Sequence, residues 1–151
     1  SGKQVFSETH VLLKDREKLI LSERKLSNNS AIFIIESLDS KVNIPLKIEF
    51  SKAVNIFETH SNCIFVDENK LKFPLTIRKW QEGDYFYPSG MNGKKKLSKY
   101  FKDEKYSLLD KENQWLLCSE DQIVWVIGKR ADNRFIITET TQNSIKIVLE
   151  E

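Results

Sequence analysis

The sequence has few cysteines that could form disulfides and no long apolar run that could anchor the chain in a membrane. It contains two cysteines, Cys63 and Cys118, and each stands among apolar neighbours, which favours reduced core thiols over a disulfide framework. No apolar run approaches the ~18 residues that a membrane span needs, and the first residues lack the basic and then apolar layout of a signal peptide. We therefore expect a cytoplasmic protein without membrane contact. The single methionine is Met91, so we expect the chain to be a piece of a longer protein.

Side chains that carry catalysis or bind metals are also scarce. His60 and Cys63 have a spacing that could supply two zinc ligands, but the sequence offers no second pair beside them. Ser7, His10 and Asp15 could be written as a catalytic triad, yet they lack the strained turn that exposes such a serine. Walker, Gly-x-Gly-x-x-Gly and Ser-Gly-Gly-x-Asp-Ser nucleotide loops are missing from the sequence. The chain is therefore expected to have no metal, no cofactor and no catalytic residue of its own.

The composition is nevertheless that of a folded protein. Hydrophobic residues make up 40% of the 151 residues, aromatic residues 11% and charged residues 30%, which is enough apolar material for a packed core. The formal net charge of +2 is too small to indicate a polyanionic partner. Any attraction to such a partner must come from how the charges are placed.

Short segments rich in β-branched and aromatic residues, bounded by polar turn residues, recur along the chain. They predict strands at residues 18–22, 31–36, 44–50, 62–67, 71–78, 123–128, 135–138 and 144–149. With few helical patterns beside them, these strands indicate a strand-rich α+β fold or a sandwich with helical insertions. Glycines, aromatics and lysines become denser near residue 70, so we expect a strand-rich segment over residues 1–70 and a second domain over residues 71–151.

The clearest helical pattern covers residues 94–105. Leu97, Tyr100 and Phe101 recur at i, i+3 and i+4 and predict one apolar face. At about 100° per residue, Lys95, Lys99 and Lys102 fall on the opposite side. We therefore predict a short basic amphipathic helix.

Positive charge is concentrated in this segment. Its six lysines are Lys94, Lys95, Lys96, Lys99, Lys102 and Lys105. They stand against Asp103 and Glu104, so the local charge is +4, more than that of the whole chain. Lys129 and Arg130 add cations after the strand predicted at 123–128, and backbone amides at a helix start after Gly93 would favour a phosphate. The cluster predicts a surface for nucleic-acid phosphates, although a lysine-rich helix face is also often plain solvated surface.

Residues 78–90 place aromatic side chains among charges and turns. Residues 85–87 are Tyr-Phe-Tyr, which could stack on the bases of single-stranded RNA or belong to the core. Gly83 and Gly90 mark turns on either side of them. Asp84 could cap the first turn or pair with Arg78 and so hold the loop. We therefore assign these two glycines, Arg78 and Asp84 to the organisation of the loop.

Residues 73–105 and the strand predicted after them resemble the C-terminal domain of tRNA(Ile)-lysidine synthetases. The family pattern combines Arg-x-x-x-x-Gly-Asp-x-Phe, a Pro-x-Gly-Met turn, a Lys-Lys-Leu helix that ends in Phe-x-Asp-x-Lys, and Ile-x-Trp-Val-x-Gly-x-Arg. The matching residues are Arg78, Gly83, Asp84, Phe86, Pro88, Gly90, Met91, Lys95, Lys96, Leu97, Phe101, Asp103, Lys105, Ile123, Trp125, Val126, Gly128 and Arg130. Residues 7–16 resemble the segment that precedes this domain. Two positions depart from the pattern, because Lys99 replaces a frequent acidic residue and Tyr106 a frequent proline.

The resemblance implies an ATP-dependent ligase that adenylates the wobble cytidine of a minor isoleucine tRNA and joins lysine to it. In such enzymes ATP, with Mg, and the chemistry belong to an N-terminal nucleotide-binding domain, which we expect this chain to lack, so that it should be inactive alone. The C-terminal domain is expected to hold the tRNA around its acceptor stem, through phosphate and 2′-hydroxyl contacts. Its fold is expected to resemble a three-layered domain with an unusual β-sandwich found in the phenylalanyl-tRNA synthetase β subunit.

Minor isoleucine tRNA and the N-terminal catalytic domain are therefore the expected partners, and a homodimer stays open. The residues predicted to contact phosphates are Lys94, Lys95, Lys96, Lys99, Lys102, Lys105, Lys129 and Arg130. The alternative, from another functional class, is a structural or interaction domain that packs on the catalytic domain without touching RNA. Its lysines would then serve solubility.

Overall fold

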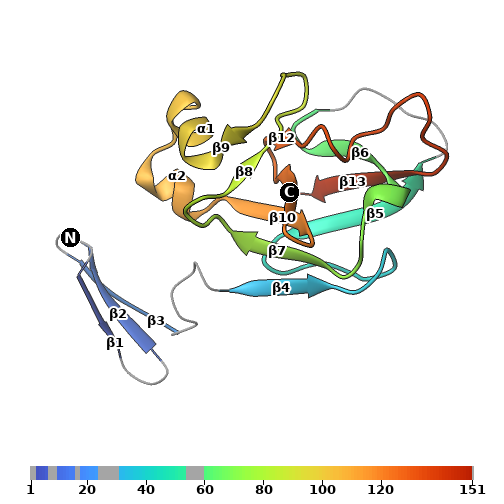
Figure 1. The fold of residues 1–151 in the computed structure, drawn as a ribbon. Helices are drawn as coiled ribbons and strands as arrows, with labels where there is room; N and C mark the ends of the chain where they lie inside the picture. Colours follow the sequence, from blue (N-terminus) through green and yellow to red (C-terminus); the bar gives the residue numbers. More distant parts are fainter. Residues whose placement is uncertain (1–2, 7–9, 16–17, 24–30, 54–59, 151) are drawn as a thin grey trace. The chain divides into compact units, whose positions relative to one another are not determined.

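The computed structural model describes residues 3–6, 10–15, 18–23, 31–53 and 60–150 of the chain. Two compact units divide the chain, Ser1–Ala31 and Ile32–Glu151. In the first unit, strands β1 (Lys3–Phe6), β2 (His10–Asp15) and β3 (Lys18–Glu23) form an antiparallel sheet in the order β1-β2-β3 (Figure 1).

Two antiparallel sheets build the second unit. The five-stranded sheet has the order β12-β11-β10-β7-β4, and the three-stranded sheet has the order β5-β13-β6. The first contains β4 (Ile32–Ile35), β7 (Leu75–Lys79), β10 (Trp115–Ser119), β11 (Gln122–Val126) and β12 (Arg130–Ala131). The second contains β5 (Lys47–Ala53), β6 (Cys63–Asp67) and β13 (Ser144–Glu150). The predicted strand-rich α+β character is confirmed.

Short elements complete this unit. A 3-10 turn, η2 (Glu68–Lys70), follows β6. Strands β8 (Tyr85–Phe86) and β9 (Lys95–Lys96) pair as a two-stranded ribbon that leads directly into helix α1 (Leu97–Asp103), and helix α2 (Leu108–Glu112) comes next. Figure 1 shows β8, β9 and the two helices gathered at one side of the five-stranded sheet.

The main core lies between the two sheets. Leu75 and Ile77 of β7, and Ile145 and Ile147 of β13, are fully buried in one apolar cluster. Each pair is separated by one residue, because successive side chains of a strand point to opposite faces. Alternation of this kind is what made these strands recognisable in the sequence.

Helix α1 covers the other face of the five-stranded sheet. Its residues Leu97, Tyr100 and Phe101 are buried in a second cluster with Leu116 of β10, whereas the next residue of β10, Leu117, belongs to the main core. The second unit therefore stacks in layers of helix, five-stranded sheet and three-stranded sheet. The predicted apolar face of the helix is confirmed.

The helix is shorter at its start than the sequence pattern predicted. Lys95 and Lys96 are extended and pair with β8, and the helix begins at Leu97, whose N–H donates to the carbonyl of Asp84 at 2.9 Å. The prediction of helix from residue 94 is therefore wrong, because the ribbon takes up the backbone groups of the first turn. The helix-start amides expected to face a phosphate after Gly93 are not there.

The end of α1 forms a Schellman motif. The N–H of Tyr106 donates to the carbonyl of Phe101 at 2.8 Å, and that of Lys105 to the carbonyl of Lys102 at 3.1 Å. Lys105 has a φ of 59°, and the rings of Phe101 and Tyr106 stack with centroids 4.5 Å apart. A proline in place of Tyr106 would remove the first of these hydrogen bonds.

The compact units divide at residue 31, not near residue 70 as the composition suggested. Strand β4 pairs with β7 and β6 pairs with β13, so residues 32–67 share both sheets with the later part of the chain. Residues 135–138, predicted as a strand, form only an isolated bridge between Ile136 and Val66. None of the helices in the described ranges has the length and apolar character of a membrane span.

Candidate nucleic-acid interface

The β8–β9 ribbon, the loop between its strands and the start of α1 enclose a surface hollow of about 520 Å³. We call it the basic hollow. Lys94, Lys95, Lys96 and Lys99 line it on one side, and Tyr85, Pro88 and Met91 contribute its apolar surface. The structure thus brings four of the eight predicted phosphate-binding residues together around one depression.

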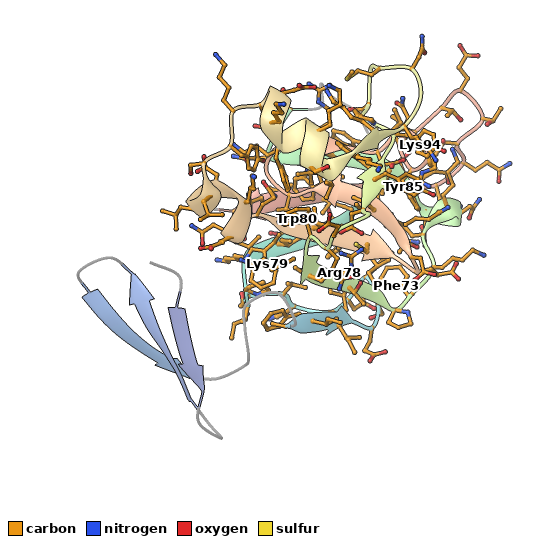
Figure 2. The ribbon with its side chains drawn as sticks, turned by 60° about the vertical axis from the view of Figure 1, so that its left-hand side comes forward. Phe73, Arg78, Lys79, Trp80, Tyr85 and Lys94 are labelled. Carbon is orange, nitrogen blue, oxygen red and sulfur yellow. The ribbon has the colours of Figure 1, made fainter. Side chains whose placement is uncertain are left out.

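The four lysines of the basic hollow differ in how free their charges are. Lys95 Nζ lies 2.5 Å from Asp103 Oδ2 and its side chain is only 18% exposed, whereas Lys99 is 69% exposed and 3.9 Å from the same carboxylate. Lys94 Nζ lies 4.6 Å from the centre of the Tyr85 ring, and Lys96 is exposed. Tyr85 and Lys94 are labelled in Figure 2. The hydrogen bond from Lys95, with the charges of neighbouring lysines, lowers the pKa of Asp103. Asp103 therefore offsets mainly the charge of Lys95.

The ion pair of Arg78 and Asp84 holds the start of the β8–β9 ribbon, because Asp84 directly precedes β8. The carboxylate of Asp84 accepts hydrogen bonds from two guanidinium nitrogens of Arg78, at 2.9 and 3.1 Å, and from the N–H of Gln81 at 2.7 Å. Burial is the largest single effect and lowers the pKa of Arg78, but the hydrogen bond to Asp84 and the negative charges nearby together outweigh burial, so the pKa of Arg78 is raised. Since the Asp84 carbonyl also holds Leu97, this pair ties β7 to the start of α1. Gly83, with a φ of 95°, makes the turn between them.

A second group of polar residues supports the loop of the ribbon, and the sequence analysis missed most of it. Asp132 is fully buried and its carboxylate accepts from Arg134 at 2.9 and 3.0 Å and from the N–H of Tyr87 at 2.9 Å. Asn133 Nδ2 donates to the carbonyls of Pro88 and Met91 at 3.1 and 2.9 Å. The only sequence signal for these roles is the polar run after the strand predicted at 123–128. From that run the sequence analysis identified only the cations Lys129 and Arg130.

The remaining predicted residues lie outside the lining of the basic hollow. Lys102 and Lys105 are exposed on α1 and at its end. Lys129 Nζ lies 5.9 Å from the centre of the Tyr106 ring, and Arg130 donates to the carbonyl of Ser89 at 3.1 Å.

Gly90 makes the turn that contains the Ser89 carbonyl. Its φ is 81°, and the N–H of Met91 donates across the turn to the carbonyl of Pro88 at 3.1 Å. The third position of such a turn requires positive φ, which glycine adopts without strain. The turn places Met91 on the rim of the basic hollow.

Lys79 is a buried cation that sequence reasoning did not identify. Its side chain is almost fully buried, with Nζ 4.2 Å from the Trp115 ring centre and in contact with the Glu112 carbonyl at the end of α2. Burial lowers the pKa of Lys79. Its partners are structural, so it is not part of the interface.

The described residues contain no group of three or more His, Cys, Asp or Glu side chains that could hold an ion such as Mg²⁺. Cys63 is buried, whereas His60 is exposed and its Nδ1 accepts from the N–H of Asn62 at 3.4 Å. The side chains of Ser7, His10 and Asp15 lie outside the described residues.

Family models match two parts of the chain. Residues 75–149 match the TilS substrate C-terminal domain, and residues 1–24 match the TilS substrate binding domain. The tRNA(Ile)-lysidine synthase of Parabacteroides distasonis is 44% identical over 145 residues, which are 93% of this chain and 33% of that protein. The chain belongs to the tRNA(Ile)-lysidine synthase family. The resemblance seen in residues 73–105 is thereby confirmed.

Two further comparisons define how far this membership reaches. The tRNA(Ile)-lysidine synthase of Bacteroides thetaiotaomicron is 40% identical over 95% of this chain and 32% of its own length, so the chain spans about a third of these curated relatives. A crystal structure of the TILS C-terminal domain matches with a TM-score of 0.65 at 20% identity, over 80% of this chain and 97% of that one. At this identity the match establishes the fold alone.

Proposed function

We propose that this chain is the tRNA-binding C-terminal part of a ligase that joins lysine to the wobble cytidine of a minor isoleucine tRNA. The observation that carries the proposal is the basic hollow, in which Lys94, Lys96 and Lys99 keep exposed charges while Asp103 offsets chiefly Lys95. Family membership supplies the parent reaction, because the relatives are tRNA(Ile)-lysidine synthases. ATP with Mg would then act in the catalytic domain of the longer protein.

The expected target on the tRNA is duplex backbone around the acceptor stem. The deep, narrow major groove of A-form RNA hides base edges, so recognition rests on phosphates, 2′-hydroxyls and shape. Lysines at the ends of flexible stems on the ribbon and α1 suit phosphates, because each is a compact charge with rotatable donors. Lys102, one turn along α1 from Lys99, extends the same basic surface.

The test is binding of the 151-residue chain to a minor isoleucine tRNA transcript and to an unrelated tRNA across a salt series. If about four lysines contact phosphates, the logarithm of the binding constant should fall with the logarithm of salt concentration at a slope of roughly −3 to −4. Binding that prefers the isoleucine transcript would locate specificity in this domain as well.

Charge reversal then assigns the surface. Lys96→Glu, Lys99→Glu and Lys102→Glu together should abolish binding, and thermal unfolding should be unchanged because all three side chains are exposed. Lys95 is left intact because its ion pair with Asp103 makes it part of the fold. Lys41→Glu, Lys52→Glu and Lys72→Glu together, at exposed positions outside the lining of the basic hollow, are the control with the same change of charge. Equal binding by the triple variant and the control would refute the proposed surface.

A second candidate function, packing on another polypeptide, rests on exposed apolar side chains at the edge of the five-stranded sheet. Ile32 and Ile34 of the edge strand β4, together with nearby Ile44, are exposed to 55%, 61% and 69%. An exposed apolar strand edge is a place where another polypeptide can pair. A domain that packs on its own catalytic domain, or on a second copy of itself, would use this edge. Failure of the chain to bind either tRNA even at low salt would favour this candidate.

A further inference from the structure

We propose that the basic hollow takes an unpaired nucleotide at the end of an RNA helix, with its base stacked on Tyr85. The proposal rests on the proposed function and deepens it, because it assigns duplex phosphates and an unpaired base to different residues of the same surface. Phosphates of the duplex would be held by Lys96, Lys99 and Lys102, whereas Tyr85 and Met91 would hold the base.

Exposure of Tyr85 is the first reason. Its side chain is 40% exposed, and Tyr85 is the one aromatic residue in the described ranges that falls in the exposed class. Its neighbours Phe86 and Phe101 are fully buried. Met91, across the same hollow, is 44% exposed. Two exposed apolar side chains within one hollow offer a surface that duplex phosphates would leave uncovered.

The Tyr85 ring is also held in place before any ligand arrives. Its edge packs against Tyr87, with ring centres 6.2 Å apart at 72°. Arg134 lies 4.5 Å from the Tyr87 ring centre and is itself fixed by buried Asp132. A ring that is already immobilised loses little conformational entropy when a base stacks on it.

Two cations lie close to the Tyr85 ring. Lys94 Nζ is 4.6 Å from the Tyr85 ring centre and the Arg134 guanidinium carbon is 6.0 Å from it. The flexible stem of Lys94 allows its ammonium to leave the ring for a phosphate while a base takes its place. The hollow of about 520 Å³ lies within the range of about 300–1,000 Å³ typical of small-ligand sites. Aromatic platforms beside positive charge are how unpaired bases are commonly bound.

The experiment compares three RNA duplexes of one sequence: blunt-ended, with a short unpaired 3′ tail, and with a short unpaired 5′ tail. The full chain should bind at least one tailed duplex about 5- to 150-fold more tightly than the blunt duplex, the range that one base stacked on an aromatic ring supplies. Tyr85→Ala should remove this preference, and Tyr85→Phe, the matched control, should keep it. A 2-aminopurine base in the preferred tail should be quenched on binding by the parent chain and not by Tyr85→Ala.

The outcomes separate the two levels of the proposal. If all duplexes bind equally, or if Tyr85→Ala weakens blunt and tailed duplexes alike, the unpaired-nucleotide site is refuted while phosphate binding by the lysines stands. If the chain binds none of the duplexes at low salt, the proposed function is overturned together with this site. Thermal unfolding of both Tyr85 variants distinguishes loss of a contact from loss of the fold.

Discussion

Replacement of Asp84 by asparagine should destabilise the protein by about 3 kcal/mol, because it leaves the Arg78 guanidinium with a neutral partner in a largely buried site. The side chains of Arg78 and Asp84 are only 15% and 14% exposed. Removal of one partner of a buried ion pair costs about 3–5 kcal/mol, and residual solvent contact places this pair near the lower end. The Asp84 carboxylate also accepts the N–H of Gln81, so one change weakens three hydrogen bonds.

Urea unfolding followed by tryptophan fluorescence measures this loss. For a chain of this length, about 3 kcal/mol should lower the midpoint of thermal unfolding by roughly 6–12 °C. Glu82→Gln is the matched control, since Glu82 is exposed and two residues away, and it should change stability by less than about 0.5 kcal/mol. A second replacement, Arg78→Gln, should cost less in the Asp84→Asn background than alone, because the unpaired charge is then removed. A loss below about 1 kcal/mol for Asp84→Asn would refute the reasoning.

Three further predictions concern α1 and the cysteines. Lys105→Gly should raise the free energy of unfolding by about 1 kcal/mol in urea denaturation, because a φ of 59° is strained for lysine and free for glycine; a destabilised variant would contradict this. The Asp103 carboxyl should titrate below the ~3.9 of free aspartate by NMR, and its stabilising effect should be present above that pH and lost as the pH falls through the folded-state value. Lys95→Gln should move the pKa of Asp103 back upward. Burial raises the pKa of the Cys118 thiol to about 11, so neither Cys118 nor buried Cys63 should react with a thiol reagent at neutral pH until the chain unfolds.

Sequence periodicity was most informative where one face of an element is buried. Leu97, Tyr100 and Phe101 identified the buried face of α1, and alternation in β7 and β13 identified strands whose inward residues form the main core. Strand β10 was missed, and its run of apolar residues does not alternate because both of its faces are buried. Strands β6 and β11 are also buried on both faces, and they were predicted from their β-branched and aromatic residues and the turns beside them, not from alternation.

The bounds of helices and compact units were harder to predict from the sequence than the existence of the helices and strands. Residues 94–96 continue the helical pattern of α1, yet they lie in the ribbon with β8, because backbone pairing with residues earlier in the chain wins over local preference. The expected boundary near residue 70 failed to mark a compact unit for a related reason. Strands from both sides of it belong to the same two sheets, and composition carries no information on strand order.

The sequence by itself determined the family, the local charge of +4 and the apolar face of α1, because these depend on residue types and their spacing along the chain. Only the tertiary structure decided which charges stay free. Closure of the ribbon brings Lys95 onto Asp103, leaves Lys96 exposed and places Lys94 over Tyr85. It also leaves Tyr85 exposed while the next residue, Phe86, is fully buried. Such differences between adjacent residues follow from which face of a strand each occupies and what packs against it, and neither is fixed until distant parts of the chain meet.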